Sequence, residues 1–99
     1  MQLHLGQSTS ISSERVIGVF DLDTTSQSRY TRHFLAASEK SGRVVNVTTE
    51  LPKSFIVAGP PRRRQGLPTG DYAVYISQIS SRTLKKRADQ QTFDPEDTL

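Results

Sequence analysis

Short stretches of alternating hydrophobic and polar residues run through the chain, and a period of two is typical of β-strands. Near the start, for example, Leu3 and Leu5 alternate with Gln2 and His4. Residues that favour turns, mainly glycine, proline and serine, separate these stretches. The pattern predicts strands over residues 2–5, around Ile11, and over residues 15–22, 43–47, 54–58 and 72–76.

Residues 15–22 are expected to form the central strand, because both faces of this stretch are apolar. Val16 and Phe20 would share one face, and Ile17 and Val19 would lie on the other. A chain of 99 residues has a thin core and too little material to cover both faces. We therefore predict a closed homo-oligomer of more than two subunits, with Ile17, Val19 and Phe20 at the contact between copies.

A longer helix is predicted directly after the central strand. Thr24 and Gln27 have the spacing of a capping box, in which a threonine accepts a hydrogen bond from the third helical amide. Tyr30 and Phe34 then begin an apolar stripe at helical spacing. Gly42 is well placed to end the helix in the left-handed conformation.

A shorter helix is predicted over residues 80–88, with Ser80 or Ser81 as its cap. Leu84 and Ala88 lie four residues apart and can face a core together. A helix of this length is marginal in isolation, so it must dock against the rest of the protein.

These elements predict an α+β fold, with a small β-rich domain of about five to six short strands, one longer helix and one short C-terminal helix. The domain would span residues 1–88. Residues 59–71 hold three prolines and three glycines and are expected to form a mobile, basic hairpin loop. Residues 89–99 are polar and acidic and are expected to form a disordered tail.

Charge is distributed unevenly along the chain, although the net charge is only +3. Residues 1–51 hold five basic and five acidic residues, residues 52–88 hold eight basic residues and one acid, and residues 89–99 hold four acids. A basic block of this kind favours a polyanionic partner. The alternative is an ordinary solvated surface.

The run Asp21-Leu22-Asp23-Thr24 after an apolar strand is similar to the motif of haloacid-dehalogenase-type phosphatases, in which the first aspartate attacks phosphorus. Such enzymes also need a sheet of several parallel strands, a downstream lysine and carboxylates that hold Mg²⁺. No later acid follows a second apolar strand in a way that would return it to Asp21. A strand end followed by a helix start explains the same residues, so we predict no enzyme activity and no cofactor.

Other chemistry is sparse. The chain has no cysteine, and His4 and His33 lack the spacing with a third donor that a metal site needs. No apolar run approaches the length of a membrane span, and the first residues do not resemble a signal peptide. We expect a cytoplasmic protein, nucleoid-associated if it binds DNA, with no membrane partner and no small-molecule substrate.

Several segments, taken in order, resemble the small bacterial extracellular-matrix regulatory (Rem) family, and most closely its RemB-type branch. These segments are "LHLG", "VIGVFDLD" before a helix, "GRVVNV", "LPKSFIV" and "VYISQISSRTLKKRA". The resemblance covers residues 1–88. It implies a compact β-rich fold like that of LytTR-type DNA-binding domains, and ring-shaped oligomers that bind DNA and activate matrix genes.

The chain departs from the DNA-binding branch of that family, which carries arginines just before the strand that here is "SFIVA". Leu51 and Pro52 occupy those positions here, and only Lys53 is basic. The arginines of the insertion "PPRRRQGLPTG" can restore positive charge at another place.

We therefore expect an oligomeric DNA-binding regulator of matrix or biofilm-type genes that contacts duplex DNA mainly through phosphates. The alternative is a ring-forming scaffold or protein-interaction module without direct DNA binding. The predicted DNA contacts are Lys53, Arg62, Arg63, Arg64, Arg82, Lys85 and Lys86.

Overall fold

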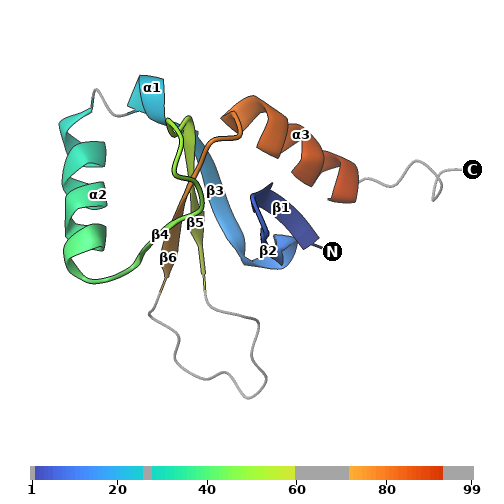
Figure 1. The fold of residues 1–99 in the computed structure, drawn as a ribbon, viewed down its shortest axis with the longest axis horizontal. Coiled ribbons are helices and arrows are strands. Elements are labelled where there is room, and N and C mark those ends of the chain that lie inside the picture. Colours follow the sequence, from blue (N-terminus) through green and yellow to red (C-terminus); the bar gives the residue numbers. More distant parts are fainter. Residues whose placement is uncertain (1, 26–27, 60–71, 93–99) are drawn as a thin grey trace, which may run out of the picture.

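A four-stranded sheet lies between one helix on one face and a hairpin with a second long helix on the other (Figure 1). The structure is a computed structural model, and it describes residues 2–25, 28–59 and 72–92. Its elements are, in chain order, β1 (Gln2–Gly6), β2 (Thr9–Ser12), the 3₁₀ turn η1 (Ser13–Arg15), β3 (Val16–Asp21), α1 (Leu22–Thr25), α2 (Arg29–Lys40), β4 (Val44–Asn46), β5 (Ser54–Ala58), β6 (Ala73–Ser77) and α3 (Ser81–Thr92).

The strand order in the larger sheet is β3-β5-β6-β4. The prediction that residues 15–22 form the central strand is therefore wrong, because β3 lies at an edge and pairs only with β5. β5 pairs antiparallel with both β3 and β6, whereas β4 pairs parallel with β6. β1 and β2 form a separate antiparallel hairpin. These strands and helices confirm the predicted α+β fold, with the longer helix after β3 and a further helix at the C-terminal side.

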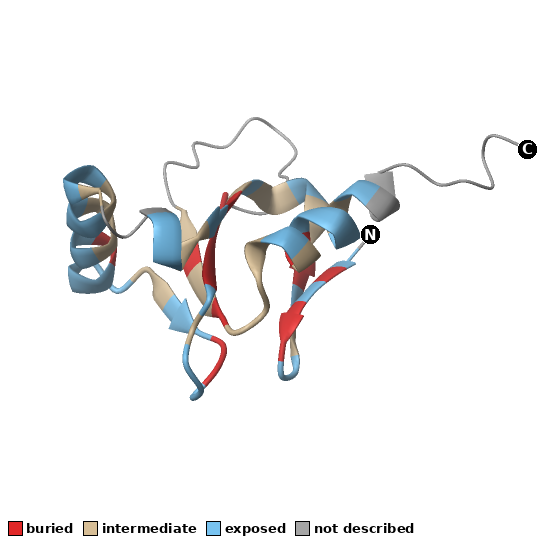
Figure 2. Ribbon diagram, turned by 90° about the horizontal axis from the view of Figure 1, so that it is seen from above, coloured by how far each residue is buried: buried red, intermediate tan, exposed pale blue. Residues whose placement is uncertain are grey.

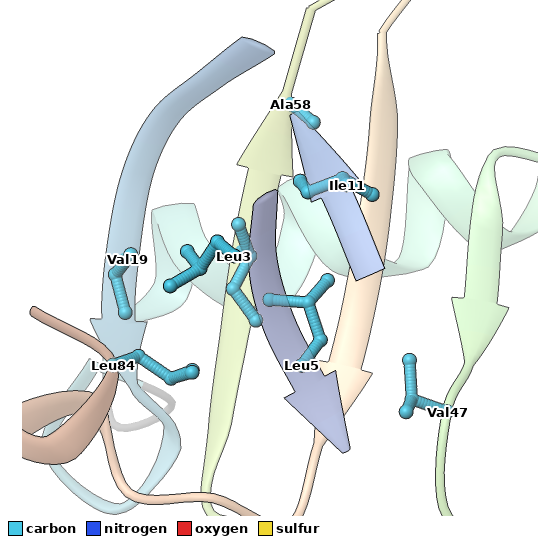
Figure 3. Close-up of a cluster of buried hydrophobic side chains, with 8 residues drawn as sticks. Leu3, Leu5, Ile11, Val19, Val47, Ala58 and Leu84 are labelled. Atoms are coloured by element: carbon cyan, nitrogen blue, oxygen red, sulfur yellow. The ribbon is translucent and has the colours of Figure 1, made fainter. Parts of the chain in front are cut away.

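The main core fills the space between the sheet, the hairpin and α3. Leu3, Leu5 and Leu84 are fully buried there, and Figure 3 shows side chains of the hairpin and of α3 directed toward the sheet. The buried Ser77 hydroxyl donates to the Leu5 carbonyl over 2.5 Å and accepts a hydrogen bond from the Ile79 amide over 3.0 Å. Ser77 therefore ties β6 to the hairpin and to the approach to α3.

The second face of the sheet is covered by α2. The Phe34 ring lies 6.5 Å from the Phe55 ring and stacks on the Tyr72 ring at 5.6 Å, measured between centroids. Ser38 is fully buried in this layer, where its hydroxyl donates to the Phe34 carbonyl and hydrogen-bonds the Tyr72 hydroxyl over 3.0 Å. The predicted stripe is therefore partly wrong, because Phe34 faces the sheet while Tyr30 is 83% exposed.

A β-bulge near the start of β3 changes the predicted facing of this strand. Val16 pairs with Ala58 and Gly18 with Val57, so Ile17 is an extra residue opposite no partner. Val16 therefore packs against the same core as Val19, and Ile17 lies on the side of Phe20. The sequence pattern predicted Val16 on the side of Phe20 and Ile17 on the side of Val19, and this prediction is wrong.

The helix caps also differ from the predicted capping box. The Asp21 carboxylate accepts hydrogen bonds from the amides of Asp23 (2.7 Å) and Thr24 (3.2 Å) and so caps α1. Ser28 caps α2, which is a separate helix. The Thr24 box is wrong because Asp21, at the end of β3, already supplies the acceptor, and Gln27 lies outside the described residues.

Two helix ends agree with the sequence analysis, and one does not. Gly42 has φ +74° and ends α2 as predicted, with the Arg43 amide bonded to the Ser38 carbonyl. Ser80 caps α3. However, α3 continues to Thr92, so residues 89–92 are helical and do not belong to a disordered tail. Residues 60–71 and 93–99, which include the rest of the predicted loop and tail, lie outside the described residues.

Candidate nucleic-acid interface

The outward face of α3 carries three of the predicted DNA contacts. Leu84 is fully buried and Ala88 packs against the core, so these two residues fix the rotation of the helix. Arg82, Lys85 and Lys86 are exposed on the other side of the helix. Figure 2 shows this outward side of α3 as largely exposed. These cations therefore face away from the core, on the side opposite to the predicted inward pair Leu84 and Ala88.

Lys53 directly precedes β5, at the end of the sheet where β6 ends and the chain leads into α3. Its backbone amide donates to the Ser77 carbonyl over 2.8 Å, and its own carbonyl accepts from the Leu22 amide over 3.0 Å. The next residue, Ser54, donates its hydroxyl to the Ile79 carbonyl over 2.7 Å. The structure therefore places Lys53, which is exposed, near the first turn of α3.

The three predicted contacts Arg62, Arg63 and Arg64 fall outside the described residues. Gly59 and Tyr72, which flank that segment, lie at the opposite ends of β5 and β6 from Lys53. The five residues of β5 separate the two positions by roughly 17 Å.

Asp89 belongs to the same surface as the cations of α3, and the sequence analysis missed it. It is exposed one helical turn after Lys85 and Lys86, because α3 extends beyond residue 88. Its carboxylate lowers the net positive charge of this face. Arg87 lies on another side of the helix, where its Nη1 donates to the His4 carbonyl over 3.4 Å.

A second set of exposed cations was also missed. Arg29, Arg32 and Lys40 lie on α2, on the other side of the sheet from α3 (Figure 1). Residues 1–51 hold equal numbers of basic and acidic residues, and such a total does not show which of them share one helix face. They supply the same number of positive charges as Arg82, Lys85 and Lys86.

The predicted oligomer contact is only partly on the surface. Val19 is 8% exposed and belongs to the core, so it is not available to a second copy. Ile17 is 69% exposed and Phe20 is 38% exposed. Both line a groove of about 360 Å³ between β3, β5 and α2, together with Tyr30 of α2.

The candidate phosphatase motif has a structural role, as the cap formed by Asp21 shows. Within the described ranges, no three His, Cys, Asp or Glu side chains gather closely enough to hold a metal ion. In the same ranges, no helix is long and apolar enough to cross a membrane.

No protein-family model matches the chain, and no curated protein matches it. The similarity to the Rem family therefore rests on the quoted segments alone.

Replacement of Asp21 with asparagine is expected to lower the free energy of unfolding by about 0.3–1 kcal/mol, because the amide oxygen still caps α1 but the charge at the helix N-terminus is lost. Asp21→Ala removes the acceptor as well and is expected to cost about 0.5–2 kcal/mol. Urea unfolding measures both values. Hydrolysis of a phosphate ester that disappears in Asp21→Asn but persists in Asp89→Asn would contradict the purely structural role.

Proposed function

We propose that the protein is an oligomeric DNA-binding regulator of matrix or biofilm-type genes, and that it contacts duplex phosphates through Lys53 and the outward face of α3. The proposal rests on one observation, the exposure of Arg82, Lys85 and Lys86 on a helix that Leu84 anchors in the core. Lys53 extends this cationic surface at the start of the helix.

Cations on an anchored helix suit phosphate binding. The buried side of α3 holds the backbone in place, so the helix presents its cations in a fixed order along one face. Contacts of this kind position a protein on duplex DNA and supply most of the affinity for any sequence. Asp89 opposes them, so a cation-rich surface with moderate affinity is expected rather than a very tight one.

The combined change Arg82→Gln, Lys85→Gln and Lys86→Gln is expected to weaken binding to duplex DNA of any sequence. The plot of log K against log salt has a negative slope, and each lost phosphate contact makes it less steep by about 0.9. The magnitude of the slope should therefore decrease by up to about 2.7. Fluorescence anisotropy with a labelled duplex, titrated from about 50 to 200 mM salt, measures affinity and slope together.

The matched control is Arg29→Gln, Arg32→Gln and Lys40→Gln on α2, which removes the same number of exposed positive charges. It is expected to keep most of the wild-type slope, because α2 lies on the other side of the sheet. Equal losses in the two variants would show that net charge, and not the α3 face, determines binding. Absence of wild-type binding at about 50 mM salt and micromolar protein would sink the DNA-binding proposal.

A second candidate function is a scaffold that assembles without contacting DNA. The exposed apolar groove around Ile17, Phe20 and Tyr30 favours it, because large apolar patches mark interaction sites. A protein that assembles but shows no salt-dependent DNA binding would support this alternative.

A further inference from the structure

The groove beside β3 gathers most of the large exposed apolar side chains that the described residues contain. The described residues include five large hydrophobic residues that are exposed. Three of them, Ile17, Phe20 and Tyr30, line this groove. The other two, Val45 and Leu51, do not. The groove is therefore a distinct apolar surface.

We propose that this groove is the docking site for a second copy of the chain, in a two-fold arrangement in which Tyr30 of each copy enters the groove of the other. The inference builds on the oligomeric part of the proposed function and names the contact that would form it.

The lining of the groove favours an apolar occupant. Phe20 and Phe55 stack with their ring centroids 5.0 Å apart and form an aromatic wall, and Phe34 lies across from them on α2. Among the side chains that line the groove, only those of Tyr30 and Thr31 carry a hydroxyl, and none is charged. A phosphate or a charged peptide would find no counter-charge in this lining.

The same surface combines an exposed aromatic side chain with a hollow, which is what a contact between two identical copies requires. Tyr30 is 83% exposed at the rim of a space of about 360 Å³. Pockets that take up small organic groups begin at about 300 Å³, so the space can accept an aromatic side chain. In a two-fold contact each copy offers the same patch to the other, so one projection and one hollow per copy satisfy both partners.

The exposed apolar area of the groove is a substantial part of what a stable contact needs. From their exposed fractions, Ile17, Phe20 and Tyr30 leave roughly 400 Å² accessible in the single chain. A standard interface takes about 800 Å² from each partner. These three residues thus supply about half of it, and the surrounding parts of β3 and α2 would supply the rest.

Docking at the groove leaves the proposed DNA surface open. The groove lies on the α2 side of the sheet, and α3 lies on the other side (Figure 1). Each dimer would therefore present two copies of the α3 cations. A two-fold contact closes at two copies, so a larger ring needs an additional contact between dimers.

The test compares Tyr30→Ala with Leu51→Ala, which removes an equally exposed apolar side chain (82%) away from the groove. Sedimentation velocity over a range of micromolar concentrations measures the assembly. The wild type and Leu51→Ala are expected to form dimers or assemblies built from dimers. Tyr30→Ala is expected to raise the dissociation constant by roughly 30-fold or more, as for an aromatic hot spot. Thermal melting checks that the variant remains folded.

Two results would overturn the inference: a wild type that is monomeric throughout this range, or a Tyr30→Ala protein that assembles as the wild type does. Either result leaves the DNA proposal standing if the α3 variant still alters the salt slope while the α2 control does not. A Tyr30→Ala monomer that keeps the α3-dependent slope would support both proposals separately.

Discussion

Truncation of Leu84 to alanine is expected to lower the free energy of unfolding by about 2–5 kcal/mol, the range measured for large-to-small changes in a protein core. Leu84 is fully buried in one cluster with Leu3, Leu5 and Val19. Among the described side chains of α3, the other residue packed against this cluster is the small Ala88, so Leu84 is the main anchor of this part of the helix. Denaturant unfolding measures the change, and a smaller total helical signal in circular dichroism at low denaturant would accompany it.

Lys85→Ala is the control for this prediction. Lys85 is the next residue along α3 but is exposed, so its truncation is expected to change stability by less than about 0.5 kcal/mol. A Leu84→Ala protein as stable as Lys85→Ala would mean that α3 does not dock through Leu84, and the rigid cationic face would lose its support.

The change Phe55→Ala is expected to be at least as severe, at about 3–5 kcal/mol. Phe55 is 3% exposed, stacks on Phe20 at 5.0 Å and lies 6.5 Å from Phe34, measured between centroids. Its removal therefore breaks two aromatic contacts and opens a cavity between α2 and the sheet. Thermal and denaturant unfolding both measure the loss.

Tyr30→Ala serves as the comparison within the same layer. It removes an aromatic ring that is 83% exposed, so the stability of the single chain should change by less than about 0.5 kcal/mol. Similar destabilisation by Phe55→Ala and Tyr30→Ala, measured at protein concentrations where both are monomeric, would contradict the assignment of Phe55 as the buried ring of this layer.

Short sequence patterns predicted those elements that depend on residues close together in the chain. Alternation gave the strands, and the spacing of Leu84 and Ala88 gave the inward face of α3. Gly42 marked the end of α2, because a positive φ is readily adopted by glycine. The bulge at Ile17 could not be predicted in this way. It arises from the pairing of β3 with β5, which lies more than thirty residues further along the chain.

The misplaced stripe of α2 has a different physical cause. Ser38 lies at the centre of the buried face, because the Phe34 carbonyl and the Tyr72 hydroxyl satisfy its own hydroxyl. A polarity pattern treats a serine as an outward residue, so it did not identify Ser38 as a buried position of α2. The Tyr72 partner is distant in sequence, and only the folded chain shows it.

The exposed cations of α3 were predictable from the sequence, but the surface that they form with Lys53 and Asp89 was not. Exposure of the α3 cations followed from helical spacing. The position of Lys53 depends on hydrogen bonds to Ser77 and Leu22, which join three separate segments. Asp89 was missed because the acidic composition of residues 89–99 predicts a disordered tail, and the predicted helix therefore ended at residue 88.

The layer that contains Leu3, Leu5 and Leu84 is assembled from segments near opposite ends of the described chain, and Ser77 bonds to Leu5 across 72 positions. A ribosome releases the hairpin first, at a time when the helix that covers it has not been made. The nascent hairpin therefore shows its leucines to water and to neighbouring polypeptides until α3 emerges. Completion of this layer therefore waits for α3, and contacts between segments so distant in sequence are expected to slow folding.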